Sequence, residues 1–202
     1  MKIVGILGSP TAGSRSASLL GVALSHLQPI TSRVHLVSIR ELPAEAVLQA
    51  QLGHAALRTA VQAVVEADVV IVATPIYKAA YSGLLKVFLD LLPAEALRGK
   101  TVLPLASGGS VAHLLALDYA LKPVLSALGA RDILDAVFAT DAQIPQHGPL
   151  GLVPSAEVRQ RVELTLQPLF ERADGFARGE EAARERDALL ARVHPPQLQE
   201  AS

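Results

Sequence analysis

The residues with the clearest chemical meaning lie in a hydroxyl-rich segment near the N-terminus. Residues 8–16 follow an apolar run and precede a helical pattern, so they join a buried strand to a helix N-terminus. Such a junction offers free backbone N–H groups and the positive end of the helix dipole. No GxGxxG fingerprint can be written here, so we predict a site for one phosphate, with an ordinary helix cap as the alternative. Its candidate contacts are Ser9, Ser14, Arg15 and Ser16.

A second candidate loop contains two of the three tyrosines in the chain and follows the apolar run at residues 68–73. Aromatic and apolar groups at a strand end suit a planar, partly apolar ligand. Backbone N–H groups in such a turn can bond to ring heteroatoms, and a lysine in the loop can lie near a developing anion. Packing on a partner subunit is a compatible alternative. The candidates are Pro75, Ile76, Tyr77, Lys78, Tyr81 and Ser82.

A third loop, which begins with Ser107, Gly108 and Gly109, follows the run at residues 101–106. Paired glycines let a ligand approach the backbone closely. His113 falls about one turn into the next helical pattern. We count it as a candidate contact, and a capping or surface histidine is the alternative.

The helical pattern at residues 111–128 contains a proline in its interior. Pro123 has no N–H, so the carbonyl of Tyr119 loses its helical partner. We therefore expect a kink or π-bulge near Tyr119, a distortion that is frequent at functional sites. The pattern is also apolar nearly all round, and the mean hydropathy of the chain is +0.36. A helix without a polar face needs a cover on its outer side, so we predict a homo-oligomer, either a dimer or a tetramer.

Several kinds of chemistry are excluded by the residues that the chain lacks. It contains no cysteine, and its six histidines show no metal-binding spacing. We therefore expect no metal site. Gly99-Lys100-Thr101 resembles the end of a phosphate-binding P-loop, but position 94 is alanine and a strand pattern follows. A net charge of −1, with four Phe and three Tyr, argues against nucleic acid.

Short apolar runs alternate with longer helical patterns along the chain. This alternation predicts an α/β fold with a doubly wound parallel sheet and helices on both faces. Sheets of this kind bind ligands beyond the carboxyl ends of their strands, where the three candidate loops would lie. The predicted strands are residues 3–7, 34–39, 68–73, 101–106 and 131–138, and the predicted helices are 16–27, 55–66, 82–92, 111–128 and 156–176.

The length of 202 residues fits one domain with a tail. We predict a domain over residues 1–178 and a charged, disordered tail over residues 179–202. The apolar runs are shorter than a membrane span, and the N-terminus shows no signal-peptide cleavage site. We therefore expect a soluble, cytoplasmic protein.

Taken together, these segments closely resemble the NAD(P)H-dependent FMN reductases of the flavodoxin-like class. The resemblance spans residues 1–145. Residues 111–125 look most like the reductase component of the two-component alkanesulfonate monooxygenase system. The segments that carry the resemblance are Gly8-Ser9-Pro10 with Ser14-Arg15-Ser16, residues 73–83, residues 104–109 and residues 111–125.

The resemblance implies a five-stranded flavodoxin-like sheet and an oxidoreductase that transfers hydride from NADPH, with NADH possible, to N5 of FMN. It implies that the first loop holds the FMN phosphate and that the other two frame the isoalloxazine. It also implies that reduced flavin passes to a partner monooxygenase of sulfur metabolism. Tyr119 matches an inserted tyrosine of members that treat FMN as a diffusible substrate, so we regard it as a candidate gate. No side chain is expected to act as a chemical catalyst, because the two nucleotides carry the reaction.

Three alternatives share part of this pattern. A quinone or azo-dye reductase with bound FMN would have the same fold and cofactor and a different electron acceptor. A flavodoxin-like electron carrier would normally show acidic docking loops, which this chain lacks. A non-enzymatic nucleotide-binding regulator would account for the phosphate loop but not for the tyrosines of the second loop.

Overall fold

A computed structural model of the protein describes residues 1–31 and 33–173. Internal contacts divide the chain into two units, Met1–Leu166 and Gln167–Ser202. The tail predicted over residues 179–202 lies outside the described residues, so the boundary at residue 178 stays a prediction. The sheet and the candidate site both belong to the first unit.

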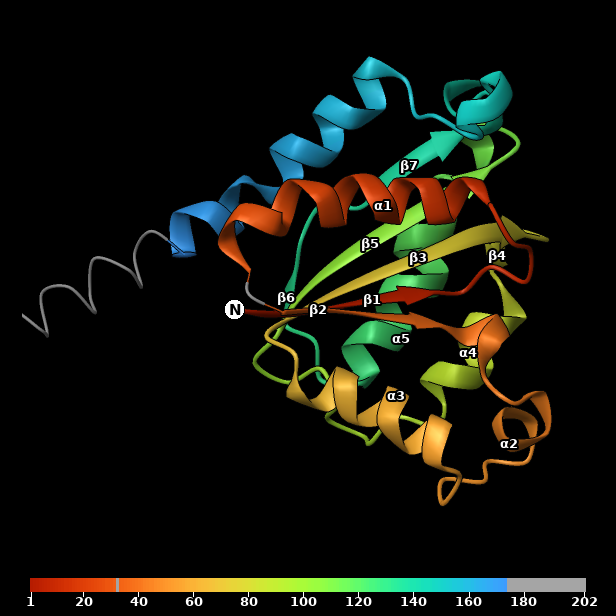
Figure 1. The fold of residues 1–202 in the computed structure, drawn as a ribbon, viewed down its shortest axis with the longest axis vertical. Coiled ribbons are helices and arrows are strands. Elements are labelled where there is room, and N and C mark those ends of the chain that lie inside the picture. Colours follow the sequence, from red (N-terminus) through yellow and green to blue (C-terminus); the bar gives the residue numbers. More distant parts are fainter. Residues whose placement is uncertain (32, 174–202) are drawn as a thin grey trace, which may run out of the picture. The chain divides into compact units, whose positions relative to one another are not determined.

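A parallel sheet with five strand positions forms the centre of this unit (Figure 1). Its order is β2-β1-β3-β5, with β6 and β7 sharing the fifth position beside β5. This is the flavodoxin-like order, and it confirms the predicted doubly wound sheet. The strands are β1 (Lys2–Leu7), β2 (Arg33–Ser38), β3 (Val69–Tyr77), β5 (Thr101–Gly108), β6 (Asp132–Ile133) and β7 (Val137–Thr140).

Helices cover both faces of the sheet, which explains why its strands are continuous apolar runs (Figure 1). On one face lies α1 (Arg15–Leu27) together with residues 156–166 of a helix that is described to residue 173. The other face carries α3 (Ala55–Glu66), α4 (Gly83–Leu89) and α5 (Lys122–Ala127), whose buried side chains form one cluster with those of the sheet. The remaining numbered helix is α2 (Ala44–Leu48). Short 3₁₀ turns occupy Gln28–Ile30, Ile39–Glu41, Val111–His113, Asp141–Gln143 and Gly148–Leu150.

The long helix predicted over residues 111–128 is divided into three pieces. A 3₁₀ turn is followed by a π-helical turn, Leu117–Leu121, and then by α5. In the π-helical turn the N–H of Lys122 donates to the carbonyl of Leu117, five residues back. The predicted distortion near Tyr119 is therefore confirmed, and it follows from the missing N–H of Pro123. Tyr119 is 80% exposed.

Strand β3 extends beyond its predicted end and forms a hairpin with β4 (Ala80–Tyr81). The two turn residues, Lys78 and Ala79, have φ values of 51° and 64°. Two consecutive left-handed residues are typical of the tight hairpin turns that glycine and asparagine usually occupy. The chain has neither residue in this turn, so the sequence pattern did not indicate a hairpin.

The segment Gly99-Lys100-Thr101, which resembles the end of a P-loop, has a structural role at the amino end of β5. Lys100 precedes β5, and its Nζ donates to the carbonyls of Val65 and Ala67 at distances of 2.7 and 2.6 Å. These carbonyls lie at the end of α3, where helical partners are missing. Partial burial lowers the pKa of this lysine. Lys100 therefore stabilises a helix terminus.

Ser82 ties the carboxyl ends of β1 and β3 to the start of α4. Its hydroxyl donates to the carbonyl of Gly8 and accepts the N–H of Leu85 at 3.1 Å. Its own N–H donates to the hydroxyl of Thr74, also at 3.1 Å. The approach is so close that a Cβ on Gly8 would lie 2.7 Å from the Cβ of Leu85. This junction fixes the first two candidate loops relative to each other.

Replacing Ser82 by alanine should therefore destabilise the fold. The change removes a helix cap and leaves the buried Gly8 carbonyl without its donor, so unfolding free energy should fall by about 1–3 kcal/mol. Urea unfolding followed by circular dichroism measures this quantity. Ser25→Ala, at an exposed position of α1, is the matched control. Equal unfolding midpoints for the two variants would contradict the role assigned to Ser82.

Candidate functional site

A cavity of about 250 Å³ lies at the carboxyl ends of the central strands. It opens where the chain leaves β1 for the edge strand β2 and returns as β3 on the other side, which is the topological switch point of the sheet. All three loops predicted from the sequence contribute to it. Its lining residues are Ser9, Thr11, Gly13, Ser14, Arg15, Ser16, Pro75, Ile76, Tyr77, Ser107, Gly108, Gly109, Asp141 and Leu152.

The first loop gives the cavity a polar wall at the start of α1. The Ser14 hydroxyl accepts the N–H of Ala17 at 3.1 Å and lies 3.4 Å from the hydroxyl of Ser16. The hydroxyl of Ser9 lies 3.2 Å from that of Thr11. Hydroxyl groups and the first N–H groups of a helix are the donors that bind phosphate oxygens. This wall therefore matches the chemistry of a single phosphate.

Arg15 brings a positive charge to the same wall and is held by the segment after β7. Its Nε donates to the carbonyl of Ile144 at 3.2 Å and lies 3.4 Å from Oδ1 of Asp141. Its two terminal nitrogens have no hydrogen-bond partner among the described residues. Arg15 and Asp141 are the charged residues of the cavity lining.

The second and third loops form the less polar part of the cavity. Pro75 and Ile76 lie along β3, and the half-exposed Tyr77 marks the rim. At the end of β5, a Cβ on Gly108 would lie 3.2 Å from the ring of Phe138 and 3.3 Å from Nδ1 of His113. A Cβ on Gly109 would have no neighbour within 4 Å. A side chain at position 108 would therefore press on Phe138 and His113, whereas one at position 109 would meet no neighbour.

Four of the predicted contacts do not line this cavity. Lys78 is at the tip of the β3–β4 hairpin, and Tyr81 packs against the core, where burial raises the pKa of its phenol. The hydrogen-bonding atoms of Ser82 are already used within the protein. Nδ1 of His113 is buried beside Gly108 and has no partner among the described residues.

Four lining residues were missed by the sequence prediction, namely Thr11, Gly13, Asp141 and Leu152. Gly13 has a φ of 60°, and a glycine between a strand and a helix is a signal that could have been used. Asp141 follows the last strand directly. The rule that ligands bind at strand ends would have found it, but the predicted strand ended at residue 138 instead of 140.

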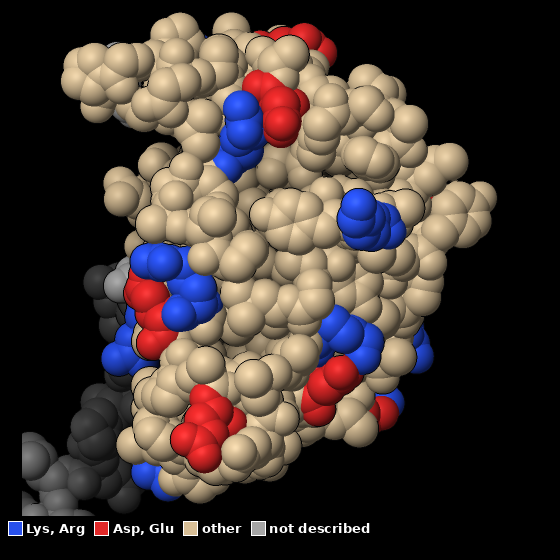
Figure 2. All heavy atoms as spheres, turned by 90° about the vertical axis from the view of Figure 1, so that its right-hand side faces the viewer, with Lys and Arg blue, Asp and Glu red and all other residues tan. Residues whose placement is uncertain are grey.

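The surface around this edge of the sheet carries few charges. Figure 2 views the side toward which β1 and β3 point in Figure 1, and its charged side chains are sparse and mostly lie beside charges of opposite sign.

Large apolar side chains are exposed on the segment that contains the π-helical turn. They are Val111, Leu114, Leu115 and Tyr119.

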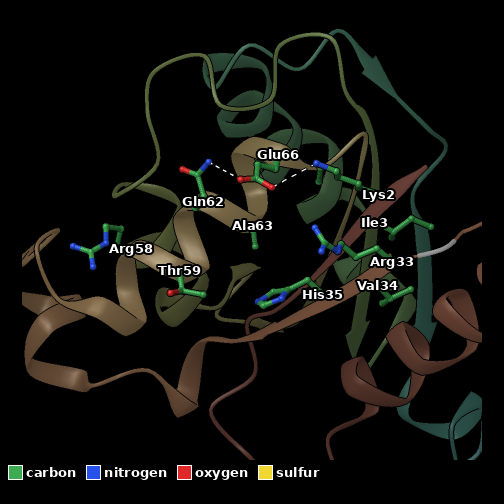
Figure 3. Close-up of a pocket in the computed structure, with 11 residues that line it drawn as sticks. Lys2, Ile3, Arg33, Val34, His35, Arg58, Thr59, Gln62, Ala63 and Glu66 are labelled. Atoms are coloured by element: carbon green, nitrogen blue, oxygen red, sulfur yellow. Dashed lines mark hydrogen bonds and ion pairs between the residues drawn. The ribbon is translucent and has the colours of Figure 1, made fainter.

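A larger hollow of about 610 Å³ lies at the opposite edge, between α3 and strands β1 and β2 (Figure 3). In this hollow the carboxylate of Glu66 accepts a hydrogen bond of 2.8 Å from Nε2 of Gln62 and lies 3.5 Å from Nζ of Lys2. The hydrogen bond from Gln62 and the charge of Lys2 lower the pKa of Glu66. No predicted site residue lines this hollow, and doubly wound sheets bind ligands at the other edge. The cavity at the carboxyl edge is therefore the candidate site.

Within residues 1–31 and 33–173, no group of three or more His, Asp or Glu side chains is arranged to hold a metal ion. No helix of this part of the chain is long and apolar enough to cross a membrane.

The sequence matches a family model over the part of the chain that builds this cavity. Residues 1–144 match the model of NADPH-dependent FMN reductases. An FMN reductase (NADPH) of Escherichia coli K12 is 53% identical over 144 residues, which are 71% of this chain and 75% of the relative. An FMN reductase (NADPH) of Pseudomonas putida KT2440 is 49% identical over 144 residues, 71% of this chain and 73% of that relative.

More distant matches extend further along the chain. An NADH-dependent FMN reductase, SfnF, of Pseudomonas fluorescens Pf0-1 is 34% identical and covers 84% of this chain and 92% of its own. The crystal structure of the NADH:FMN oxidoreductase EMOB, in its apo form, superimposes with a TM-score of 0.75 at 41% identity. The superposition covers 82% of this chain and 86% of the EMOB chain. The chain therefore belongs to the NADPH-dependent FMN reductases, a family of flavodoxin-like oxidoreductases.

Proposed function

We propose that the reaction of the family, reduction of FMN by NADPH, takes place in the cavity at the carboxyl edge. One observation carries this proposal: a hydroxyl-lined helix N-terminus with an arginine faces the same cavity as an apolar strand end and a glycine pair. FMN has a phosphate at one end and a planar ring system at the other. The polar and apolar parts of the cavity match these two ends.

The residues of the cavity have separate roles in this proposal. Ser9, Ser14, Arg15 and Ser16 bind the FMN phosphate, while residues 75–77 and 107–109 orient the ring system. When both nucleotides are bound, NADPH supplies the hydride that reduces the flavin. The protein brings the two rings together and excludes water. No side chain of the cavity has to act as a nucleophile or a proton donor.

The proposal extends to the users of the product. Reduced FMN would pass to a flavin-dependent monooxygenase, such as one that desulfonates alkanesulfonates, in the cytoplasm. In this proposal NADPH is the preferred reductant. The relatives that are 53% and 49% identical are NADPH enzymes by name, whereas the relative that is 34% identical is named as NADH-dependent.

We also propose that the protein is a homo-oligomer. Pockets that enclose a ligand of this kind usually measure about 300–1,000 Å³. A cavity of about 250 Å³ can enclose only part of FMN. The exposed apolar segment at residues 111–119 is suited to a second copy of the chain, which would bury these side chains.

The first test concerns the phosphate. Arg15→Ala should weaken FMN binding by about 1.5–3 kcal/mol, or roughly 10- to 150-fold in Kd, because a charge-assisted hydrogen bond is lost. Riboflavin has no phosphate, so the substitution should weaken riboflavin binding much less. Calorimetric titration with both flavins measures the difference, and Arg98→Ala, at an exposed ion pair with Glu95, is the control. An equal loss for both flavins would refute the phosphate assignment.

The second test concerns assembly. Light scattering at low micromolar concentration should give a multiple of the 21.2 kDa chain mass. Leu115→Glu should shift the particle toward one chain, because a charge at an apolar interface is costly to bury. Leu164→Glu is a matched control, since both leucines are 57% exposed. A stable particle of one chain mass for the unmodified protein would contradict the proposal.

The third test concerns Tyr119 as a gate for flavin release. Its side chain is 80% exposed on the π-helical turn and is therefore available for contact with a second copy of the chain. Tyr119→Ala should retain flavin through purification, with yellow protein as the readout, and should turn over free FMN more slowly. Tyr119→Phe keeps the ring and serves as the control. A colourless, folded and fully active Tyr119→Ala protein would leave only a packing role.

A further inference from the structure

We propose that Asp141 competes with the flavin phosphate for Arg15 and so keeps the affinity for FMN low enough for rapid release. This inference rests on the proposed function, because it assumes that the wall formed by the first loop binds a phosphate. It adds a residue that sets how long the flavin stays bound.

Asp141 is held in place at the cavity by the turn that it begins. The 3₁₀ turn Asp141–Gln143 is closed by a capping box, in which Oε1 of Gln143 accepts the N–H of Thr140 at 3.0 Å. The N–H of Ile144 donates to the Asp141 carbonyl at 3.3 Å. The backbone of the aspartate is therefore fixed by bonds that do not involve its carboxylate, and the carboxylate remains available to Arg15.

The carboxylate engages one edge of the guanidinium group. Oδ1 of Asp141 lies 3.4 Å from Nε of Arg15, the same atom that donates to the carbonyl of Ile144. A phosphate would therefore have to use the two terminal nitrogens of Arg15. An arginine can bind an oxyanion in a bidentate way through Nε and one terminal nitrogen, or through both terminal nitrogens. Asp141 occupies the first arrangement, so it confines the phosphate to the second and shares the positive charge of the guanidinium with it.

The charges of the cavity lead to the same conclusion. Arg15 and Asp141 cancel, so the lining has a formal charge of zero. The FMN phosphate carries about one to two negative charges near neutral pH. It enters a site whose side chains have no net charge, so its attraction depends on the hydroxyl groups and on the N–H groups of α1. The side chains of Arg15 and Asp141 are 35% and 51% exposed, so solvent weakens this effect but does not remove it. Such a site suits a flavin that must leave after each turnover.

The test is Asp141→Asn, which keeps the shape and removes the charge. The Kd for FMN should fall by about three- to tenfold, and the rate of FMN dissociation in stopped-flow fluorescence should fall with it. The Kd for riboflavin should stay unchanged. The gain for FMN should shrink in concentrated salt, which screens the carboxylate. An unchanged or higher Kd for FMN in a folded Asp141→Asn protein would overturn the proposal.

Two further variants keep the result interpretable. Asp141→Ala also removes the charge and should tighten FMN binding in the same direction. Asp90→Asn, at an ion pair with Lys86 that does not line the cavity, should leave the Kd unchanged. In an Arg15→Ala background, Asp141→Asn should tighten FMN binding by a smaller factor, because only the repulsion between the carboxylate and the phosphate remains and the competition for Arg15 is gone. A full effect in that background would overturn the competition.

The outcomes also separate this inference from the proposed function. If Arg15→Ala weakens FMN and riboflavin equally, the phosphate assignment fails, and the role of Asp141 fails with it. If Arg15→Ala acts on FMN alone while Asp141→Asn does not tighten binding, only the competition fails.

Discussion

The structure around the candidate site depends on one buried contact, in which the Ser82 hydroxyl donates to the carbonyl of Gly8. The contact joins the end of β1 to the start of α4, and the N–H of Ser82 adds the end of β3 through Thr74. Two loops far apart in the sequence are thereby fixed beside each other at the switch point of the sheet. A cavity between two strand ends keeps its shape only if the strand ends do not move independently.

The cavity combines a rigid frame with weak electrostatics. Its hydroxyl groups and glycines are held by α1 and by β5, and its charges cancel between Arg15 and Asp141. In the function proposed above, rigid positioning orients the flavin, and charge cancellation limits the affinity for its phosphate. An enzyme that reduces a diffusible flavin needs both properties, because a tightly retained flavin would behave as a fixed cofactor.

The fold and most of the cavity were predictable because each depends on local patterns. Continuous apolar runs indicated the buried strands, and hydroxyl groups, tyrosines and glycines at their ends indicated the loops. The hairpin at Lys78 and Ala79 was not predictable, because its left-handed turn contains neither glycine nor asparagine. The ion pair of Arg15 and Asp141 joins segments distant in the sequence, and no local pattern reports such a contact. The exclusion of Ser82 and His113 from the cavity also follows from packing that only the structure shows.

The π-helical turn at Leu117–Leu121 has a consequence for how such chains diverge. A wide turn with bonds five residues apart holds one residue more than an α-helical turn of the same rise. One residue can therefore be gained or lost there without rotating α5, whose Leu125 stays buried against the sheet together with Leu117 and Leu121. The outward residue, Tyr119, belongs to the wide part of the turn. Evolution can thus alter this exposed surface by a single codon while the hydrophobic core keeps its register.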